Sequence, residues 1–290
     1  YTYDEYEDCL NSGMIDAVYI ALPNNMHLEY SVRAARAGKH VLCEKPLALS
    51  VEESFELVRY CSEKKLVGAM DYSFLYIPAR TLFKELIDSG LIGDIHSLKM
   101  SFFRDDFDHW PRDWYYDPKL GGGAVVSTGS HLISSVHHLT NHRIDWVDAT
   151  ITTKREVDIG FNAIMQTSNG CVCTIEISHC IAGPGRHVIE ANGEKGSLLL
   201  DHQSNVVSIL NGTSFTHSIL PHHQVGFGSR AWEGNFRLQP TARVLEMVVS
   251  QINFQSHEFK LGFDLGADDV KVINAIKKSH TEKRRIYIPT

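Results

Sequence analysis

The sequence predicts an α/β fold in which a partial, doubly wound parallel sheet precedes an α+β domain with a large, mostly antiparallel open sheet. Three observations support this prediction. Short apolar runs and helical segments alternate over residues 15–66, and their short connections imply parallel pairing. From residue 95 onward, several strand-like runs follow one another with little helix between them. Helical patterns return after residue 240.

The first part shows clear start and stop patterns. Residues 17–22 form a continuous apolar run, which is typical of a strand buried on both faces. Gly38 stands where a glycine commonly ends a helix. Ser50 and Glu53 have the spacing of a capping box, so a helix is expected to begin there. Together these patterns predict strands over 17–22, 40–43 and 66–69, and helices over 30–37 and 50–64.

The second part combines strands with a few long helices. Asn169-Gly170 predicts a hairpin turn, and residues 104–120 predict a long loop rich in aromatic and charged residues. The expected helices cover 77–90, 123–139, 240–253 and 266–279. The expected strands cover 95–103, 145–154, 159–167, 171–181, 186–191, 197–201, 205–210 and 285–289.

The composition is typical of a globular protein, with 43% hydrophobic and 22% charged residues among 290. A net charge of −7 argues against nucleic acid or an anionic membrane surface as a partner. No apolar run approaches the roughly 20 residues that cross a bilayer. The six cysteines are scattered without a C-x-x-C spacing, which favours a reduced, cytoplasmic protein over a disulfide framework.

Two stretches of sequence resemble a known family. The first consists of Ala21-Leu22-Pro23-Asn24-Asn25-Met26-His27 and of Ala37-Gly38-Lys39-His40-Val41-Leu42-Cys43-Glu44-Lys45-Pro46. These residues are similar to the T/S-P-N-x-x-H and A-G-K-H-V-L-x-E-K-P patterns of the Gfo/Idh/MocA family (glucose-fructose oxidoreductase, inositol dehydrogenase and MocA), with Leu22 in place of a small hydroxyl residue. The resemblance implies that residues 1–75 form the C-terminal part of a Rossmann-like dinucleotide-binding domain. Residues 76–290 would form an α+β domain for substrate binding and oligomerisation.

The resemblance also implies an activity. The chain would be an NAD- or NADP-dependent oxidoreductase that transfers a hydride to or from a secondary alcohol or carbonyl of a sugar, polyol or diol. Lys45 would orient the nicotinamide and polarise the substrate oxygen, although as an isolated residue it would be taken for a solvated loop lysine. His27 either lines the cofactor pocket or only occupies the first turn of a helix. The implied cofactor-binding residues are Pro23, Asn24, His27, Glu44, Lys45 and Pro46.

The second stretch runs from Trp114 to His131 and contains Gly121-Gly122-Gly123. It resembles the family's W-x-x-D-P…G-G-G-x-x-x-D-x-G-x-H pattern. Positions 127 and 131 lie one helical turn apart on one face. The family has an aspartate and a histidine there that handle the substrate proton, so the implied catalytic residues are Lys45, Ser127 and His131, unless His131 only packs in the core. The implied substrate-binding residues are Tyr72, Trp114 and Asp117.

Two departures from the family pattern affect the predicted activity. Ser127 stands in place of the aspartate that would orient the imidazole and stabilise its charged form, and a serine brings no charge. The arginine of the family's N-x-R-F motif is absent, because Asp71-Tyr72-Ser73-Phe74 occupies its place. The alternative to an enzyme is therefore a catalytically lapsed binding or regulatory protein on the same fold.

The family's G-x-G-x-x-G fingerprint is not found in its expected setting. The segment Gly226-Phe227-Gly228-Ser229-Arg230-Ala231 meets a relaxed pattern, but no strand–turn–helix surrounds it. The opening residues read as the middle of a domain. We therefore expect the chain to be a piece of a longer protein, to bind the nucleotide weakly and to be inactive as given. An upstream extension of about 60–70 residues that carries the fingerprint would favour the enzyme.

The remaining expectations concern partners. No metal site is predicted, because the histidines near residue 140 lack a carboxylate or thiol to complete one. The charged residues of 104–109 either contact a hydroxyl-rich substrate or form a solvated surface. A broad sheet with helices mainly on one side should pair with another copy, giving a homodimer or homotetramer, and residues 161–165 and 174–177 are expected to offer apolar side chains to that face. The expected ligand is a small carbohydrate-like molecule.

Overall fold

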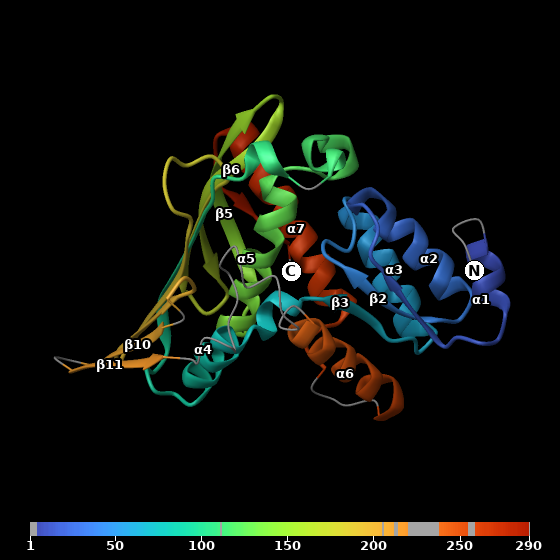
Figure 1. Ribbon diagram of the computed structural model, residues 1–290, viewed down its shortest axis with the longest axis horizontal. Helices are drawn as coiled ribbons and strands as arrows, with labels where there is room; N and C mark the ends of the chain where they lie inside the picture. Colours follow the sequence, from blue (N-terminus) through green and yellow to red (C-terminus); the bar gives the residue numbers. More distant parts are fainter. Residues whose placement is uncertain are drawn as a thin grey trace.

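The computed structural model describes residues 5–110, 112–204, 206–211, 214–219, 238–254 and 259–289. These residues form two sheets, and Figure 1 shows the smaller one beside α1, α2 and α3 and the larger one seen nearly edge-on, with α5 and α7 between the two. The predicted α/β fold, with a parallel sheet followed by a large and mostly antiparallel one, is confirmed. The segment 226–231 lies outside the described residues.

The small sheet is parallel, with the strand order β1-β2-β3. Its strands are β1 (Ala17–Ile20), β2 (His40–Glu44) and β3 (Gly68–Asp71). Its helices are α1 (Tyr6–Asn11), α2 (His27–Arg36) and α3 (Val51–Glu63). Gly38 ends α2 with a φ of +74°, and the side chain of Ser50 accepts from the Glu53 amide at 3.4 Å to begin α3, as predicted. The helix α2 begins three residues earlier than expected, and β3 begins two residues later.

The large sheet has the strand order β11-β10-β9-β8-β4-β7-β6-β5-β12. Neighbouring strands in this sheet are antiparallel except for β4 and β7, which run parallel with Phe103 opposite Ser178. Gly170 makes the predicted turn between β6 and β7 with a φ of +88°. The strand β11 was not expected. The strands are β4 (Ile95–Phe103), β5 (Ile144–Lys154), β6 (Val157–Thr167), β7 (Val172–Ser178), β8 (Arg186–Gly193), β9 (Ser197–Asp201), β10 (Val206–Asn211), β11 (Ser214–Ile219) and β12 (Ile286–Tyr287).

The helices α4 (Pro78–Asp88), α5 (Ala124–Thr140), α6 (Leu238–Phe254) and α7 (Phe263–Glu282) complete the fold. The helix α7 joins the two hydrophobic cores, because Phe263 lies in the core of the small sheet and Ile276 in that of the large one. The carbonyl of Leu261 also accepts from the Met70 amide at 2.7 Å, so the C-terminal part of the chain returns to the small sheet. The domain boundary near residue 75 stays a prediction.

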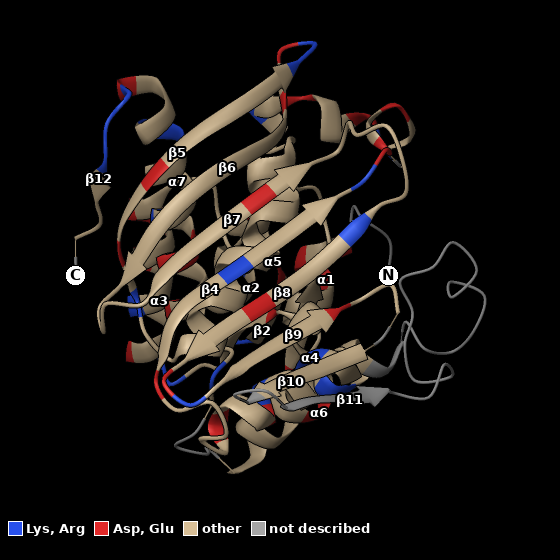
Figure 2. Cartoon of the chain, turned by 90° about the vertical axis from the view of Figure 1, so that its left-hand side faces the viewer, with Lys and Arg blue, Asp and Glu red and all other residues tan. Residues whose placement is uncertain are grey.

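One face of the large sheet is not covered by any described helix, and Figure 2 shows this face toward the viewer with the helices behind it. The expectation about its side chains was partly wrong. In β6, Phe161, Ala163 and Met165 are buried in the core, because strand residues alternate between faces. Ile164 is 50% exposed on the open side. Among the described residues, no helix is long and apolar enough to span a membrane, and no cluster of three metal-ligating side chains occurs.

Candidate functional site

The carboxyl edge of the small sheet carries a group of polar side chains that bond to one another. The hydroxyl of Tyr19, near the end of β1, lies 2.7 Å from Oδ2 of Asp71 and 3.1 Å from Oε1 of Glu44. Burial, together with the charges of the two carboxylates, raises the pKa of Tyr19, so this residue stays a hydroxyl donor. Burial also raises the pKa of Glu44, although Lys45 opposes that change. This edge therefore holds two carboxylates directly beside the predicted catalytic lysine.

Lys45 connects this edge to the second part of the chain. Its Nζ donates to the carbonyl oxygen of Ser127 at 3.1 Å, in the first turn of α5. Burial lowers the pKa of Lys45, whereas the charges of Glu44 and Asp71 raise it. A strand-end ammonium thus lies against the helix that carries His131, one turn beyond Ser127. The structure brings these three predicted catalytic residues together.

His27 is the first residue of α2 and is 1% exposed. Its Nδ1 lies 2.6 Å from the carbonyl oxygen of Pro46, and its Nε2 lies 2.8 Å from that of Leu22. Burial lowers the pKa of His27, although the two carbonyls favour its charged form. The imidazole therefore braces the loops that follow β1 and β2. Because both ring nitrogens face main-chain carbonyls, a structural role for His27 is favoured over contact with a cofactor.

Asn24 joins the strand-end loop to the glycine-rich loop before α5. Its Nδ2 donates to the carbonyl oxygen of Gly121 at 2.8 Å. Gly121 has a φ of +81°, and a Cβ at this position would lie 2.7 Å from Cβ of Asn24. Only a glycine permits both this conformation and this contact. Gly121 therefore allows the glycine-rich loop to lie close against Asn24, in another part of the chain.

The start of α5 is held by a residue that the sequence did not indicate. Oδ1 of Asp158, on β6, accepts from the amide of Val125 at 2.9 Å. Burial raises the pKa of Asp158, while its bond to the Val125 amide opposes that change. A Cβ on Gly123 would lie 2.3 Å from the same carboxylate oxygen. This carboxylate caps the helix that presents Ser127 and His131.

Ser127 makes no hydrogen bond to the imidazole of His131 one turn away. Its hydroxyl donates to the carbonyl oxygen of Gly123 at 2.6 Å, which is a local bond within the helix. His131 packs against Phe74, with ring centroids 4.6 Å apart, and its buried Nδ1 has no partner among the described residues. Burial, then the charges of Lys45 and Arg80, lowers the pKa of His131 well below its usual range. His131 is therefore neutral near pH 7.

The three predicted substrate-binding residues have different surroundings. Tyr72 is 1% exposed, and its hydroxyl donates to Oδ2 of Asp269 in the core. The carboxylate of Asp117 accepts from the Lys119 amide at 2.8 Å and so stabilises a turn. Trp114 stacks on Tyr115 with ring centroids 4.0 Å apart, and its buried Nε1 has no partner in the described part of the chain. Of the three, Tyr72 is the one whose polar group is fully engaged in the core.

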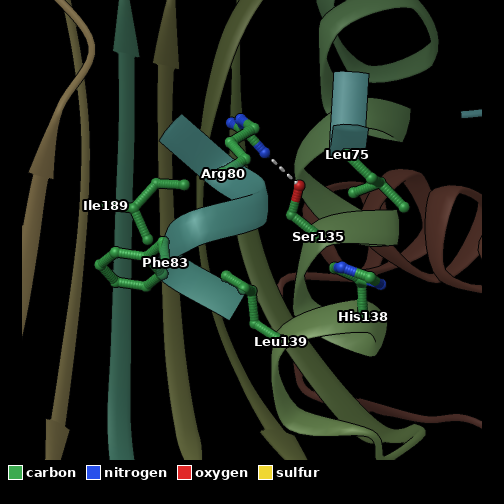
Figure 3. A pocket seen from close by; sticks show the side chains of 7 residues that line it. All are labelled: Leu75, Arg80, Phe83, Ser135, His138, Leu139 and Ile189. Atoms are coloured by element: carbon green, nitrogen blue, oxygen red, sulfur yellow. Dashed lines mark hydrogen bonds between the residues drawn. The ribbon is translucent and has the colours of Figure 1, made fainter. Parts of the chain in front are cut away.

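Arg80 on α4 was missed by the sequence analysis. It is 3% exposed and donates through NH1 to Oγ of Ser135 at 2.7 Å, as Figure 3 shows, while NH2 lies 2.8 Å from Nε2 of His187. Its guanidinium also lies 3.8 Å from the centre of the Phe74 ring. No carboxylate among the described residues pairs with it. The adjoining cavity in Figure 3 has room for about one water molecule.

An arginine early in a helix is usually solvated, so no sequence pattern distinguished Arg80. The only available indication was the missing arginine of the N-x-R-F motif a few residues earlier. The ring of Phe74 contacts both the Arg80 guanidinium and His131, and the charge of Arg80 acts on His131 together with that of Lys45. The histidine therefore has cations, and no carboxylate among the described residues, as its charged neighbours.

Comparison with known proteins places both parts of the chain in one group. Residues 1–72 match the model of an oxidoreductase family with an NAD-binding Rossmann fold, and residues 81–199 match the GFO/IDH/MocA C-terminal domain. The chain is 27% identical over 326 residues to an uncharacterized oxidoreductase of Synechocystis sp., an alignment that covers 100% of this chain and 83% of the relative.

Two further relatives have named activities. The chain is 33% identical over 204 residues to a dTDP-3,4-didehydro-2,6-dideoxy-alpha-D-glucose 3-reductase of Streptomyces violaceoruber, covering 68% of this chain and 57% of the relative. It is 34% identical over 181 residues to a D-xylose 1-dehydrogenase (NADP(+)) of Haloferax volcanii, covering 61% and 54%. These alignments span little more than half the length of each relative.

Solved structures share the fold. An oxidoreductase domain protein from Kribbella flavida superposes with a TM-score of 0.85 at 22% identity, covering 98% of this chain and 83% of that chain. Levoglucosan dehydrogenase in complex with NADH and L-sorbose superposes with a TM-score of 0.84 at 21% identity, with coverages of 98% and 83%. At these identities the likeness is one of fold.

Proposed function

The chain belongs to the Gfo/Idh/MocA oxidoreductase family. We propose that it is an NAD(P)-dependent oxidoreductase that acts on a secondary alcohol or carbonyl of a sugar, polyol or diol. The observation that carries this proposal is the 3.1 Å contact between Nζ of Lys45 and the carbonyl oxygen of Ser127. It brings the strand-end ammonium next to the helix turn that bears His131. The sugar reductase and the xylose dehydrogenase among the relatives support the substrate class.

The residues between the edge of the small sheet and the start of α5 fit a nicotinamide cofactor. Nε1 of Trp114 and Nδ1 of His131 are buried polar atoms without partners in the described residues, and such atoms favour a polar ligand. When bound, the nicotinamide would accept or donate the hydride. NAD and NADP both stay in the proposal, because one relative is named for NADP and one solved neighbour holds NADH. The residues that would hold the nicotinamide side are Pro23, Asn24, Glu44, Lys45 and Pro46.

Lys45 and His131 would act on the substrate oxygen. The ammonium of Lys45 would donate a hydrogen bond to that oxygen and stabilise its alkoxide character as the C–H bond breaks. His131 is the group that the family pattern assigns to the proton. Burial and the positive charges of Lys45 and Arg80 disfavour the protonated form of His131. This histidine can therefore hydrogen-bond to the substrate oxygen but is a poor acceptor for its proton.

The Lys45→Met variant tests the proposal. We expect kcat to fall at least about 100-fold, since loss of such a donor costs about 3 kcal/mol or more in the transition state. Turnover is followed by NAD(P)H absorbance across a panel of aldoses, polyols and their oxidised forms. Lys64→Met, which changes an exposed lysine at the end of α3, is the matched control and should keep its rate. An unchanged kcat in Lys45→Met would remove this lysine from the mechanism.

A binding or regulatory role is the second candidate. It is favoured by Ser127 in place of an aspartate and by the absence of any described carboxylate beside His131. Under this reading the unaltered protein shows no turnover with any member of the panel, although calorimetry detects sugar or nucleotide binding. The two candidates are therefore separated by the unaltered protein alone.

We also propose that the open face of the large sheet pairs with a second copy, giving a homodimer or homotetramer. Ile164 is 50% exposed there, and Lys99 pairs with Glu176 on neighbouring strands at 4.0 Å. The Ile164→Lys variant should weaken self-association while leaving the melting temperature of the monomer nearly unchanged. Light scattering at tens of micromolar measures the effect, and a monomeric mass for the unaltered protein would contradict the proposal.

A cytoplasmic location stays a prediction from the scattered cysteines.

A further inference from the structure

A second histidine close to the proposed site has the carboxylate that His131 lacks. His179 follows β7 directly and is 5% exposed. Its Nδ1 lies 2.6 Å from Oδ1 of Asp106, and its Nε2 lies 2.7 Å from Oγ1 of Thr128. A carboxylate, an imidazole and a hydroxyl are thus connected in series.

The protonation states follow from these contacts. A carboxylate accepts hydrogen bonds only, so Asp106 takes the Nδ1–H of His179. In the neutral imidazole Nε2 is then an acceptor, and the Thr128 hydroxyl donates to it. Oδ2 of Asp106 is held by Nε of Arg104 at 3.0 Å. Burial alone would raise the pKa of Asp106, but the hydrogen bond and charge of His179, with the charge of Arg104, bring it below its ordinary value.

The hydroxyl end of this series lies on the helix face that bears His131. Thr128 and His131 are three residues apart in α5, so their side chains are neighbours on the helix surface. Thr128 is half-buried, whereas Ser127 and Gly129 on either side are buried. His179 is enclosed, and the ring of Trp110 meets it edge-on with centroids 5.4 Å apart. Asp106 is bonded to His179 and to Arg104, so Thr128 is the half-buried member of the series that shares a helix face with His131.

We propose that Thr128, His179 and Asp106 form the proton relay of the reaction, with Thr128 touching the substrate hydroxyl. The proposal rests on the oxidoreductase function proposed above. In the oxidative direction, the substrate O–H proton passes to Oγ1 of Thr128 while the threonine's own proton passes to Nε2 of His179. The imidazolium that forms stays paired with Asp106. The hydride leaves the same substrate carbon for the nicotinamide, and the alcohol becomes a carbonyl; reduction reverses each transfer.

The relay accounts for the missing aspartate at position 127. An acid–base group must stabilise the proton that it takes up, and a carboxylate provides that stabilisation. His131 is flanked by Lys45 and Arg80, which oppose a further positive charge. His179 bonds to an ionised carboxylate at 2.6 Å. Lys45 and His131 would thus orient the substrate oxygen, while His179 accepts the proton and holds it as an imidazolium.

Substitutions at Thr128 test the relay by kinetics. Thr128→Val keeps the shape of the side chain and removes the hydroxyl, and we expect kcat to fall by about 10²–10⁴, with little change in KM. Thr128→Ser should restore most of the rate. His179→Gln should lower kcat by a similar factor, because the Thr128 hydroxyl then has no imidazole to receive its proton. The exposed Thr281→Val, at the far end of α7, is the control that should keep the unaltered rate.

A second measurement does not depend on turnover. With ¹⁵N-labelled histidine, the carboxylate-bonded Nδ1–H proton of His179 should give a far-downfield NMR signal that is present in the unaltered protein and in Thr128→Val and lost in Asp106→Asn. Absence of that signal from the unaltered protein would overturn the relay. So would a Thr128→Val enzyme with an unchanged kcat and pH profile, because the contacts would then only anchor the loop after β4. If the unaltered protein turns over no substrate at all, the proposed function itself fails, and the relay fails with it.

Discussion

The carboxyl edge of the small sheet and the wall formed by α5 and α4 meet at Lys45, but their polar groups are bonded differently. At the edge, both nitrogens of His27 and the amide of Asn24 face main-chain carbonyls. On the wall, Nδ1 of His131 and Nε of Arg80 have no partners among the described residues. Bonded groups maintain a shape, whereas unbonded ones cost free energy that a ligand can recover. The side chains of His27 and Asn24 at the edge therefore hold the chain in place, whereas His131 and Arg80 on the wall keep nitrogens without partners in the described part of the chain.

The largest expected effect concerns stability at the edge. His27→Ala removes a buried ring and leaves the carbonyls of Leu22 and Pro46 without their partner, so the free energy of unfolding should fall by about 3 kcal/mol. Urea denaturation followed by circular dichroism measures the loss. His96→Ala, which changes an exposed residue of β4, should stay within about 0.5 kcal/mol of the unaltered protein. A comparable loss in both variants would show that the edge is not specifically braced.

The stability contributed by the α5–α4 wall should depend on pH in acid. Burial, then the charges of Lys84 and Lys260, lowers the pKa of His138 from 6.5 to about 4. Above pH 6.5 the residue is neutral in both states and has no effect. As the pH falls from 6.5 to 4 the unfolded chain takes up a proton that the folded chain refuses, so roughly 3 kcal/mol of stability is lost. His138→Leu should remove most of that loss, as urea midpoints at pH 7 and pH 4 would show.

The control for the acid experiment is His142→Gln, an exposed residue just after α5. It should leave the difference between pH 7 and pH 4 as it is in the unaltered protein. If His138→Leu also leaves that difference intact, the buried histidine does not govern the acid response of the wall.

The smallest effect is expected from giving the wall a carboxylate. Ser127→Asp places a negative charge one turn before His131 and should stabilise the protonated form of that histidine. If the added charge raises the pKa of His131 by about one unit, kcat should stay the same or rise up to about tenfold. Ser127→Ala, which removes only the bond to the Gly123 carbonyl, is the comparison. Steady-state kinetics across pH distinguishes the two variants. A fall in kcat that occurs in Ser127→Asp but not in Ser127→Ala would mean that the added carboxylate competes for Lys45.

Much of the fold was readable because periodicity and caps act locally. The run at 17–22, Gly38 and the Ser50–Glu53 pair each correspond to an element or to its end. The strand β11 was missed because its residues, Ser214–Ile219, mix polar and apolar types without a marked strand pattern. Antiparallel backbone pairing with β10 forms this strand despite its weak propensity.

The site was less readable than the fold. The resemblance indicated Lys45 and His131, which the structure brings to the same helix turn. The sequence did not show where the Ser127 hydroxyl would bond; it donates to the carbonyl four residues earlier, as helical serines easily do. Arg80 and Asp158 act through contacts with residues far along the chain. No spacing rule reports such contacts, so they had to come from the coordinates.

The parallel pairing of β4 with β7 explains how the relay is assembled. Parallel strands that end level, here at Phe103 and Ser178, release their chains at the same edge of the sheet. Asp106 and His179 are 73 positions apart in sequence, but each lies only a few residues beyond one of those two ends. The proposed proton acceptor is thus positioned by strand register, because a slip of one residue would turn the side chains to the opposite face. The contact between Asp106 and His179 therefore depends on the pairing of β4 with β7 and not on the length of the loop beyond Trp110.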